Sequence, residues 1–395
     1  MNLFSRLAEK IRKRRWKRPT TAAAQLQMRL DRLGLPSADP GAEAVIREGV
    51  AWLCRAQDHS ASHDGGVARD YSLEKGWATS YPETTGYIVP TLLDYARRYG
   101  NSDVRKRAER MLDWFVAIQL PGGGFQGGRV DSTPVVPVTF NTGQILIGLT
   151  AGVAEFGDRY RPAMEAAACW LVDSLDPDGC WRKFPTPFAA PGEKAYETHV
   201  SWGLFEAERL APGRGFAEAG LRNLRWALTK QRANGWFADN CLSDPRQPLT
   251  HTIGYVLRGV VEGYRLSGEP SLLAAAGRTA DGLLAAIRAD GFLPGRLDAN
   301  WAPAVDSVCL TGSVQIAHCL LLLYQSTGKV AYRDQAFALN AYVRRTIDID
   351  GAPEIRGAVK GSFPVDGGYG RFEYLNWAAK FMVDANILEL DVRGG

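Results

Sequence analysis

The chain repeats one short pattern at distant positions, and this internal repeat limits its fold more than any other feature. Residues 81–87, 139–144 and 249–255 each place a polar side chain, a threonine and a glycine at the start of an apolar stretch. Apolar residues such as Val256 and Val260 then follow at helical spacing. The pattern therefore predicts several copies of one helical unit.

A second marker gives the length of the unit. A glycine followed closely by an aromatic or apolar residue recurs at a spacing of roughly 55 to 60 residues, which suits a long helical hairpin plus one loop. A weaker copy lies at Gly65-Gly66, and six copies fit between about residue 41 and the C-terminus. The clearer copies are Gly124-Phe125, Gly179-Cys180-Trp181, Gly235-Trp236-Phe237, Gly291-Phe292 and Gly351-Ala352-Pro353.

Each unit contains two helices of different character. The first is charged and amphipathic, as between Asn101 and Leu120, and such a helix lies at a surface. The second carries little charge all round, which is typical of a buried helix. Six alternating pairs predict an all-α toroid over residues 41–395, in which an outer ring of six helices surrounds an inner ring of six. Its central cavity is expected where the inner helices begin, near Glu83, Asn141, His199, His251, Thr311 and Asn376.

This architecture and its Gly-aromatic turns resemble the six-hairpin glycosidase-like and terpenoid-cyclase-like α/α toroids. The resemblance covers nearly the whole chain after residue 40. Members of these superfamilies include glycoside hydrolases, polysaccharide lyases, sugar epimerases and triterpene cyclases. The resemblance therefore implies an enzyme fold without choosing a reaction, because one fold can carry many chemistries.

Composition and charge restrict the partners and the compartment. The net charge of +4 is small and dispersed, which argues against a nucleic-acid partner. No apolar run reaches the roughly 18 to 20 residues needed to cross a bilayer, and no secretory signal is recognisable. The six cysteines form no C-x-x-C pair, which predicts free thiols in a reducing compartment. We therefore expect a cytoplasmic protein with no cofactor and no bound metal.

Residues 1–40 are expected to form an N-terminal extension whose beginning is strongly basic. Leu3, Leu7 and Ile11 share one helical face, while eight Lys or Arg side chains crowd the other faces of the same stretch. A basic amphipathic helix of this kind binds anionic membrane surfaces. The pattern predicts peripheral docking at the inner membrane through residues 1–20, with a solvated tail as the alternative.

Carboxylates near the expected cavity suit hydrolysis of a glycosidic bond, which uses one protonated and one ionised carboxyl group. Glu83 is predicted to be the acid, because it lies at the start of an inner helix. Glu197 or Asp306 is predicted to be the base or nucleophile. A purely structural explanation of Glu83 is that an acid in the first turn favours the helix dipole. The predicted function is cleavage of a poly- or oligosaccharide in cell-surface polysaccharide metabolism.

Histidines at matching helix starts favour a different reaction. His199 and His251 could remove a proton from a sugar carbon, as a polysaccharide lyase or a uronate or sugar epimerase would require. This alternative stays open beside hydrolysis. The residues that could assist the histidines or neutralise a neighbouring carboxylate are Tyr255, Tyr374, Asn141, Asn376 and Arg371.

Aromatic and polar side chains gather in the loops before the inner helices. Aromatic rings pack against the C–H faces of sugars while polar groups bind hydroxyls, so a carbohydrate ligand is predicted. Packing of the turns is the alternative explanation for several of the aromatics. A triterpene-cyclase-like enzyme and a noncatalytic binding toroid are further alternatives. The predicted binding residues are Tyr81, Gln144, Trp181, Trp202, Trp236 and Trp301, and Trp77, Tyr369 and Trp377 lie in the same loops.

Overall fold

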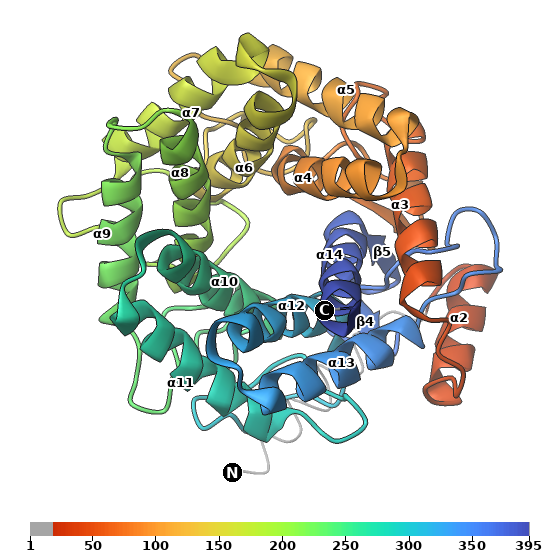
Figure 1. Ribbon diagram of the computed structural model, residues 1–395. Helices are drawn as coiled ribbons and strands as arrows, with labels where there is room; N and C mark the ends of the chain where they lie inside the picture. The colour runs from red at the N-terminus through yellow and green to blue at the C-terminus, as the bar shows by residue number, and fades with distance from the viewer. Residues whose placement is uncertain (1–18, 395) are drawn as a thin grey trace.

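The computed structural model describes residues 19–394, which form two concentric rings of helices (Figure 1). Each inner helix packs against its inner neighbours, and the last inner helix closes the ring against the first. The predicted all-α toroid of six hairpins is therefore confirmed. The inner helices are α4 (Pro82–Tyr99), α6 (Thr139–Phe156), α8 (Thr198–Leu210), α10 (Thr250–Ser267), α12 (Leu310–Thr327) and α14 (Asn376–Gly394). The outer helices are α3 (Ala42–Asp58), α5 (Ser102–Ile118), α7 (Arg161–Ser174), α9 (Phe216–Leu228), α11 (Pro270–Ala286) and α13 (Val330–Arg344).

Two kinds of connection orient the helices. The chain passes from an inner helix to the next outer helix through a short turn, as at Gly100 and Gly268, whose left-handed φ values of 64° and 69° end α4 and α10. It returns from an outer helix to the next inner helix through a longer loop. All six inner helices therefore begin at the same end of the ring, and the long loops surround that end, which we call the mouth.

Short strands within these loops join the first hairpin to the last one. Strands β1 (Asp70–Ser72), β2 (Gly76–Trp77) and β5 (Glu373–Leu375) form an antiparallel sheet in the order β2-β1-β5. A second pair joins β3 (Val308–Cys309) to β4 (Ser362–Phe363). The periodicity of the sequence did not predict these strands, because each contains only two or three residues.

Close packing of the loop on the next outer helix explains the repeated glycine. Gly179 and Gly235 have φ values of 92° and 84°, which favour glycine. A Cβ atom on them would lie 2.4 Å and 2.3 Å from the carbonyl oxygens of Arg222 in α9 and Arg278 in α11. Gly291 approaches α13 in the same way. Only a glycine lets the loop lie this close to the neighbouring hairpin.

The same contact corrects two of the expected turn positions. In the last repeat the glycine that touches the next outer helix is Gly357, not Gly351: its Cβ would lie 2.2 Å from the carbonyl oxygen of Glu48 in α3. In the second repeat it is Gly123 rather than Gly124. Because α3 belongs to the first repeat, the Gly357 contact also helps to close the ring.

Glutamines at the ends of outer helices reinforce these contacts. The side-chain amide of Gln119 donates to the carbonyls of Gly123 and Ala163, both at 2.9 Å. Gln57 and Gln231 form equivalent pairs of hydrogen bonds in their own repeats. The glutamine side chain in each of these repeats thus binds both the following loop and the next outer helix.

An additional helix, α2 (Ala22–Arg32), packs outside the rings beside α3 (Figure 1). Its buried Asp31 accepts a hydrogen bond from the ammonium of Lys360 at 2.6 Å and one from the backbone N–H of Val365 at 2.7 Å. These contacts attach α2 to the loop of the last hairpin. The predicted membrane-binding helix lies outside the described residues, apart from residues 19 and 20.

The glycine contact can be tested by adding one methyl group. Gly235→Ala combines an unfavourable φ with overlap against Arg278, and we expect it to lower the free energy of unfolding by about 3 kcal/mol. Gly213→Ala is a matched control, because Gly213 has a φ of 80° but no atom within 4 Å of its would-be Cβ. Its expected cost is about 1 kcal/mol. Urea unfolding measures both free energies. If the two variants lost the same free energy of unfolding, the close contact at Gly235 would not contribute to stability.

Candidate active site

Polar side chains from the first turns of the inner helices meet at the mouth around Tyr255 of α10. The ring of Tyr255 lies with its centroid 4.7 Å from that of His199 and 4.4 Å from that of His251. Its hydroxyl lies 3.2 Å from that of Tyr87, which comes from α4 on the other side of the ring. The structure thus brings together residues that are up to 168 positions apart in the chain. Burial raises the pKa of both tyrosines, so both keep their protons at neutral pH.

Glu83 occupies the first turn of α4 and is half-buried. Burial raises its pKa to about 7, although a hydrogen bond with Tyr81 and the charge of Arg69 oppose this shift. A carboxyl group with this pKa is partly protonated under physiological conditions. It can therefore donate a proton and then recover it, as a general acid must.

The two histidines have identical partners in neighbouring hairpins. Nδ1 of His199 lies 2.6 Å from Oε1 of Gln144, and Nδ1 of His251 lies 2.6 Å from Oε1 of Gln315. Because an amide oxygen only accepts, each Nδ1 carries the proton and each Nε2 carries the lone pair. Burial lowers the pKa of His251 to about 4 and that of His199 well below its usual value. Both imidazoles are therefore neutral at pH 7 and available as proton acceptors.

Several buried polar atoms near these residues have no protein partner within residues 19–394. Buried donors and acceptors are normally paired, so a group of unpaired ones marks a surface prepared for a polar ligand. Hydroxyl groups could both donate to and accept from this set. The atoms are Nδ2 of Asn141, Nε2 of Gln144, Nε2 of His199, Nε2 of Gln315 and Oδ1 of Asn376.

Glu197 ends a short 3-10 helix, η2 (Ala195–Glu197), immediately before α8. It is buried, and burial raises its pKa to about 8 against the opposing charge of Lys194. Its Oε2 has no hydrogen-bond partner in the described part of the chain. Glu197 is therefore protonated near neutral pH and can act as a hydrogen-bond donor, but it is poorly suited to be an ionised nucleophile.

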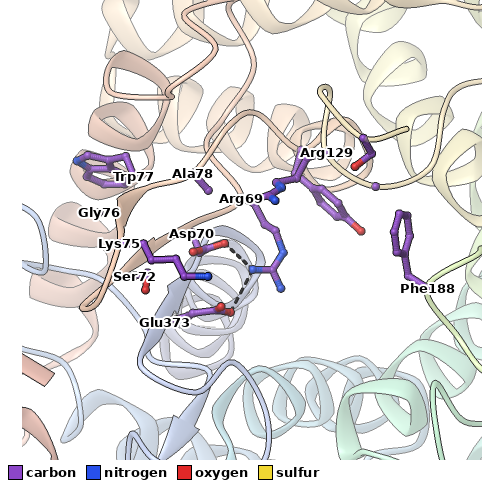
Figure 2. A pocket seen from close by; sticks show the side chains of 13 residues that line it. Arg69, Asp70, Ser72, Lys75, Gly76, Trp77, Ala78, Arg129, Phe188 and Glu373 are labelled. Atoms are coloured by element: carbon purple, nitrogen blue, oxygen red, sulfur yellow. Dashed lines mark hydrogen bonds and ion pairs between the residues drawn. The ribbon is translucent and has the colours of Figure 1, made fainter. Parts of the chain in front are cut away.

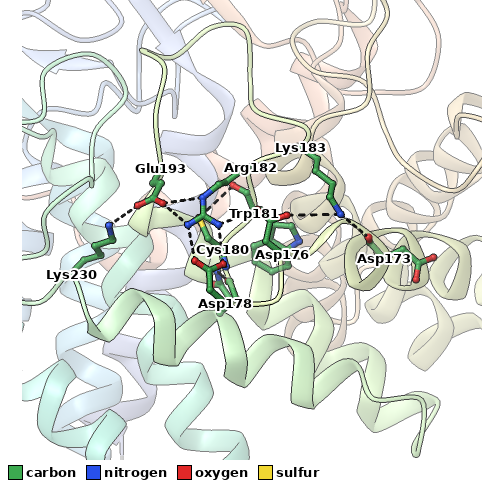
Figure 3. A network of polar contacts seen from close by, with 11 residues as sticks. Asp173, Asp176, Asp178, Cys180, Trp181, Arg182, Lys183, Glu193 and Lys230 are labelled. Carbon is green, nitrogen blue, oxygen red and sulfur yellow. Dashed lines mark hydrogen bonds and ion pairs between the residues drawn. The ribbon is translucent and has the colours of Figure 1, made fainter.

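A network of ion pairs holds the loop that leads to Glu197 (Figure 3). Arg182 contacts Asp178 at 2.7 Å and Glu193 at 2.5 Å. Lys230, in the next hairpin, also contacts Glu193 at 2.5 Å. These side chains are partly exposed, so each pair contributes little alone, but together they fix the path of the loop across the mouth.

Arg69 is a functional candidate that sequence analysis missed. It pairs with Asp70 at 2.5 Å and with Glu373 at 3.1 Å, and its guanidinium lies 5.2 Å from the centre of the Trp377 ring. Its charge also acts on Glu83. These contacts depend on the pairing of β1 with β5, and no local pattern in the sequence indicates that pairing.

A pocket of about 470 Å³ lies beside Arg69 and Tyr81 (Figure 2). Figure 2 shows Trp77 on one side of Arg69 and Phe188 on the other, with Arg129 nearer to Arg69. Aromatic surfaces and charged groups thus border the same space. The complete lining comprises Arg69, Asp70, Ser72, Lys75, Gly76, Trp77, Ala78, Tyr81, Gly128, Arg129, Ser132, Phe188 and Glu373.

Tyr369 comes from the loop of the last hairpin. Its hydroxyl accepts a hydrogen bond from Nε1 of Trp377 at 2.9 Å, and its ring centroid lies 5.5 Å from that of His251. Because the hydroxyl oxygen already accepts from Trp377, its own proton is available for a ligand. The sequence analysis counted Tyr369 and Trp377 among the aromatic residues of the expected mouth but did not include them among the predicted binding residues.

Three of the predicted binding tryptophans pack loops instead of facing the mouth. Trp181 donates its indole N–H to the carbonyl of Leu171 at 3.0 Å. Trp236 packs edge-on against Trp301, whose indole N–H donates to the carbonyl of Asn234 at 2.9 Å. All three are buried. The packing alternative therefore explains these side chains.

Three further predicted residues, Tyr374, Asp306 and Arg371, have different surroundings. The hydroxyl of Tyr374 donates to Gln27 of α2 at 3.2 Å. Asp306 is exposed in the loop before β3. The Arg371 guanidinium lies 4.7 Å from the centre of the Phe372 ring.

Trp202 lies deeper in the ring than the mouth residues. Its ring contacts His199 at a centroid distance of 5.4 Å and lies 4.2 Å from the guanidinium of Arg258. Its indole N–H donates to Glu206 at 3.2 Å. Trp202 therefore packs edge-on against His199 one helical turn further along α8.

Comparisons with known proteins agree with this architecture. No protein-family model matches the chain, and no curated protein matches it in sequence. An unsaturated glucuronyl hydrolase specific for heparin is 14% identical, with a TM-score of 0.69 over 91% of this chain and 99% of that one. The chain therefore shares the α/α toroid fold of this hydrolase.

Two further solved structures show the range of this likeness. The unsaturated glucuronyl hydrolase from Bacillus sp. GL1 is 15% identical, with a TM-score of 0.69 over 88% of this chain and 96% of that one. The cellobiose 2-epimerase from Bacillus thermoamylovorans B4167 is 10% identical, with a TM-score of 0.67 over 86% and 95%. At these identities the likeness of this toroid to its neighbours is one of fold.

The protonation state and tautomer of the two histidines can be tested by nitrogen-15 NMR of protein labelled at histidine. We expect both His199 and His251 to be neutral at pH 7 with the proton on Nδ1, and His251 to begin charging only near pH 4. Gln315→Leu should shift the tautomer of His251 alone, with His199 and its intact Gln144 bond as the internal control. A proton on Nε2 in the unsubstituted protein would contradict the assignment.

Proposed function

We propose that this chain is a carbohydrate-active enzyme that hydrolyses a glycosidic bond in an oligosaccharide held at the mouth of the toroid. The observation that carries the proposal is Glu83, a half-buried carboxyl group at the mouth with a pKa of about 7. The structural neighbours described above are named for glucuronyl groups and for cellobiose, which supports a carbohydrate ligand.

In the proposed reaction, protonated Glu83 donates its proton to the glycosidic oxygen as the bond to the anomeric carbon breaks. A water molecule attacks that carbon and releases a proton. Nε2 of His251 accepts this proton, because its lone pair is free and its Nδ1 is held by Gln315. Afterwards Glu83 is ionised and His251 is charged, and transfer of the proton back through solvent restores both.

This assignment changes the role predicted for the second carboxylate. Glu197 holds its proton up to about pH 8, so it does not suit an ionised base, and Asp306 is exposed, unlike the buried histidines. Glu197 instead can donate a hydrogen bond to the substrate. The neutral imidazole of His251 then acts as the base, a role that a second carboxylate has in two-carboxylate hydrolysis.

The pocket beside Arg69 is proposed to hold the sugar next to the scissile bond. Trp77 and Phe188 offer rings for the C–H faces of a sugar, and Arg129 and Lys75 offer donors for its hydroxyl or acidic groups. Tyr81 borders the pocket and also hydrogen-bonds Glu83, so it connects the two parts of the proposed site.

Epimerisation of a sugar is a second candidate, favoured by the matched His–Gln pairs. His199 and His251 both flank Tyr255 and both present Nε2 as an acceptor. One imidazole could remove a proton from the carbon next to a carbonyl group, and the other could return a proton to the opposite face. This candidate requires no cleavage of the substrate.

We also propose that the reaction belongs to cell-surface polysaccharide metabolism in the cytoplasm. All six cysteines are unpaired, which supports a reducing compartment. Cell fractionation tests this location, and recovery of the native protein outside the cell would contradict it.

The role of Glu83 can be tested by its isosteric amide. Because Glu83 must be protonated and His251 must be neutral, kcat/KM is expected to be constant between about pH 4 and pH 7 and to fall about tenfold per pH unit above pH 7. Glu83→Gln should reduce kcat by roughly 10² to 10⁴ and abolish this limb of the profile.

Glu43→Gln is a matched control for this experiment. Glu43 also lies in the first turn of a helix and accepts a hydrogen bond from a tyrosine, Tyr99, at 2.9 Å, but it belongs to the outer helix α3. Its substitution should leave the rate unchanged. Equal effects of the two substitutions, or a Glu83→Gln enzyme of normal rate, would contradict the assignment.

Isotopic water separates the two candidate reactions. Hydrolysis in oxygen-18 water should give shorter oligosaccharides with one heavy oxygen, detected by mass spectrometry. Epimerisation in deuterium oxide should leave the chain length unchanged and add one carbon-bound deuterium. A panel of neutral and uronate-containing oligosaccharides that shows neither result would contradict both candidates.

A further inference from the structure

The two histidine–glutamine pairs of the mouth have the same geometry, but the surroundings of their imidazoles differ. His251 contacts neutral aromatic side chains: its ring centroid lies 4.4 Å from that of Tyr255 and 5.5 Å from that of Tyr369. His199 also contacts Tyr255, at 4.7 Å. In addition, two buried cations of the inner ring lie on the side of His199 that faces away from the mouth. The two histidines are therefore not equivalent.

These cations, Arg258 of α10 and Lys380 of α14, reach His199 through aromatic rings. The guanidinium of Arg258 lies 4.2 Å from the centre of the Trp202 ring, which packs edge-on against His199. The ammonium of Lys380 lies 5.1 Å from the centre of the Tyr87 ring, whose centroid lies 6.5 Å from that of His199. The rings exclude water between the cations and the imidazole, so both charges act on it with little screening.

Each cation is held by an acid one turn farther from the mouth. Arg258 contacts Glu262 at 2.6 Å, and Lys380 contacts Asp384 at 2.6 Å. In both pairs the cation precedes the acid by four residues, which is the less favourable order for the helix dipole. Helix stability therefore does not explain this order, which turns the positive end of both pairs toward the mouth. Arg265 also contacts Glu262, at 3.0 Å, and weakens the negative end of that pair further.

Both cations act on His199 in the same direction, because a positive charge near an imidazole disfavours its protonated form. Burial is the main cause of the low pKa of His199, and the charges of Arg258, Lys380 and His251 lower it further. For His251, burial lowers the pKa to about 4, and the bond with Gln315 opposes this shift. As the pH falls, His251 is therefore the first of the two to accept a proton.

The other titratable groups around His199 are neutral in acidic solution, so they do not cancel these charges. Burial raises the pKa of each of them. They are Glu83 and Tyr87 of α4, Glu197 of η2 and Tyr255 of α10. Helix α6 presents the neutral Gln144 to His199, and α7 and α9 cover α8 from the outer ring (Figure 1). On α8 itself, Glu206 is paired with Arg209 at 3.0 Å.

We propose that Arg258 and Lys380 are positioning residues that divide the roles of the two histidines, so that His251 takes the proton and His199 stays a neutral hydrogen-bond acceptor for a substrate hydroxyl. Nε2 of His199 is buried and has no partner within residues 19–394, so its lone pair is available to a ligand at the mouth. This division of roles rests on the proposed function. It suits hydrolysis, which uses one imidazole as the base, better than epimerisation, which uses both.

Nitrogen-15 NMR of both histidines at pH 4 tests the proposal without substrate. In the unsubstituted protein about half of His251 is expected to be charged at this pH, whereas His199 stays neutral. Lys380→Gln combined with Asp384→Asn replaces the ion pair by two amides that can hydrogen-bond to each other. This variant should raise the ratio of charged to neutral His199 at least about tenfold. The ratio for His251 in the same spectrum should change much less.

A second variant and a matched control complete the experiment. Arg258→Gln combined with Glu262→Gln should affect His199 in the same direction, and it keeps the test decisive if the first variant does not fold. The control is Lys360→Gln combined with Asp31→Asn. Lys360 and Asp31 also form a buried pair at 2.6 Å, but this pair attaches α2 to the loop of the last hairpin. Its replacement should leave both histidines unchanged.

Three results would overturn the proposal. His199 and His251 could become charged together in the unsubstituted protein, both neutral pairs could leave the charge of His199 unchanged, or the control could change His199 as much as they do. Circular dichroism at pH 4 checks that each variant is folded. Because the spectra need no substrate, their outcome is independent of the oxygen-18 water experiment, which tests the proposed function by itself.

Discussion

The contact between each loop glycine and the backbone of the next outer helix is the constraint on which the toroid depends. A side chain at Gly179, Gly235 or Gly291 would overlap a carbonyl oxygen, so the loop reaches its neighbour only without one. The contact links hairpin to hairpin, and at Gly357 it links the last hairpin to α3 of the first. Five of the six hairpins are joined to the next one in this way, and the first turns of all six inner helices converge at one end of the ring.

That convergence produces the electrostatics of the mouth. The inner ring removes water from the side chains that point into it, and this disfavours every charged form. The effect keeps a proton on Glu83 and Glu197 and keeps protons off His199 and His251. Proton donors and proton acceptors therefore stand side by side near neutral pH, as acid–base chemistry requires. The fold creates this condition mainly through burial.

The architecture could be predicted from the sequence because the copies of a repeat can be compared with one another. Helix starts near Glu83, His199 and His251 followed from comparison of the copies, and the structure locates those residues at the mouth. Aromatic residues were harder to interpret. Trp181 and Trp236 follow the turn glycines, and in the structure they fill the loops that those glycines bring close. A repeated aromatic of this kind maintains the fold, so repetition is a weaker indicator of binding than an unpaired polar atom.

The rest could not be predicted because it depends on pairs far apart in the chain. Arg69 meets Glu373 only because β1 pairs with β5, and Tyr374 turns to Gln27 only because α2 packs there. The histidine partners Gln144 and Gln315 lie 55 and 64 positions away from the residues they orient. Such contacts leave no periodic trace in one sequence.

The protonation of Glu83 is the central claim of this account. Difference infrared spectroscopy of the unsubstituted protein against Glu83→Gln, recorded across the pH range, would follow the carboxyl of this residue directly. The account predicts a protonated carboxyl band that disappears with a midpoint near pH 7 and is absent from the variant. A midpoint close to that of an ordinary glutamate, about 4.3, would contradict it, because Glu83 would then be ionised at neutral pH and could not be the acid.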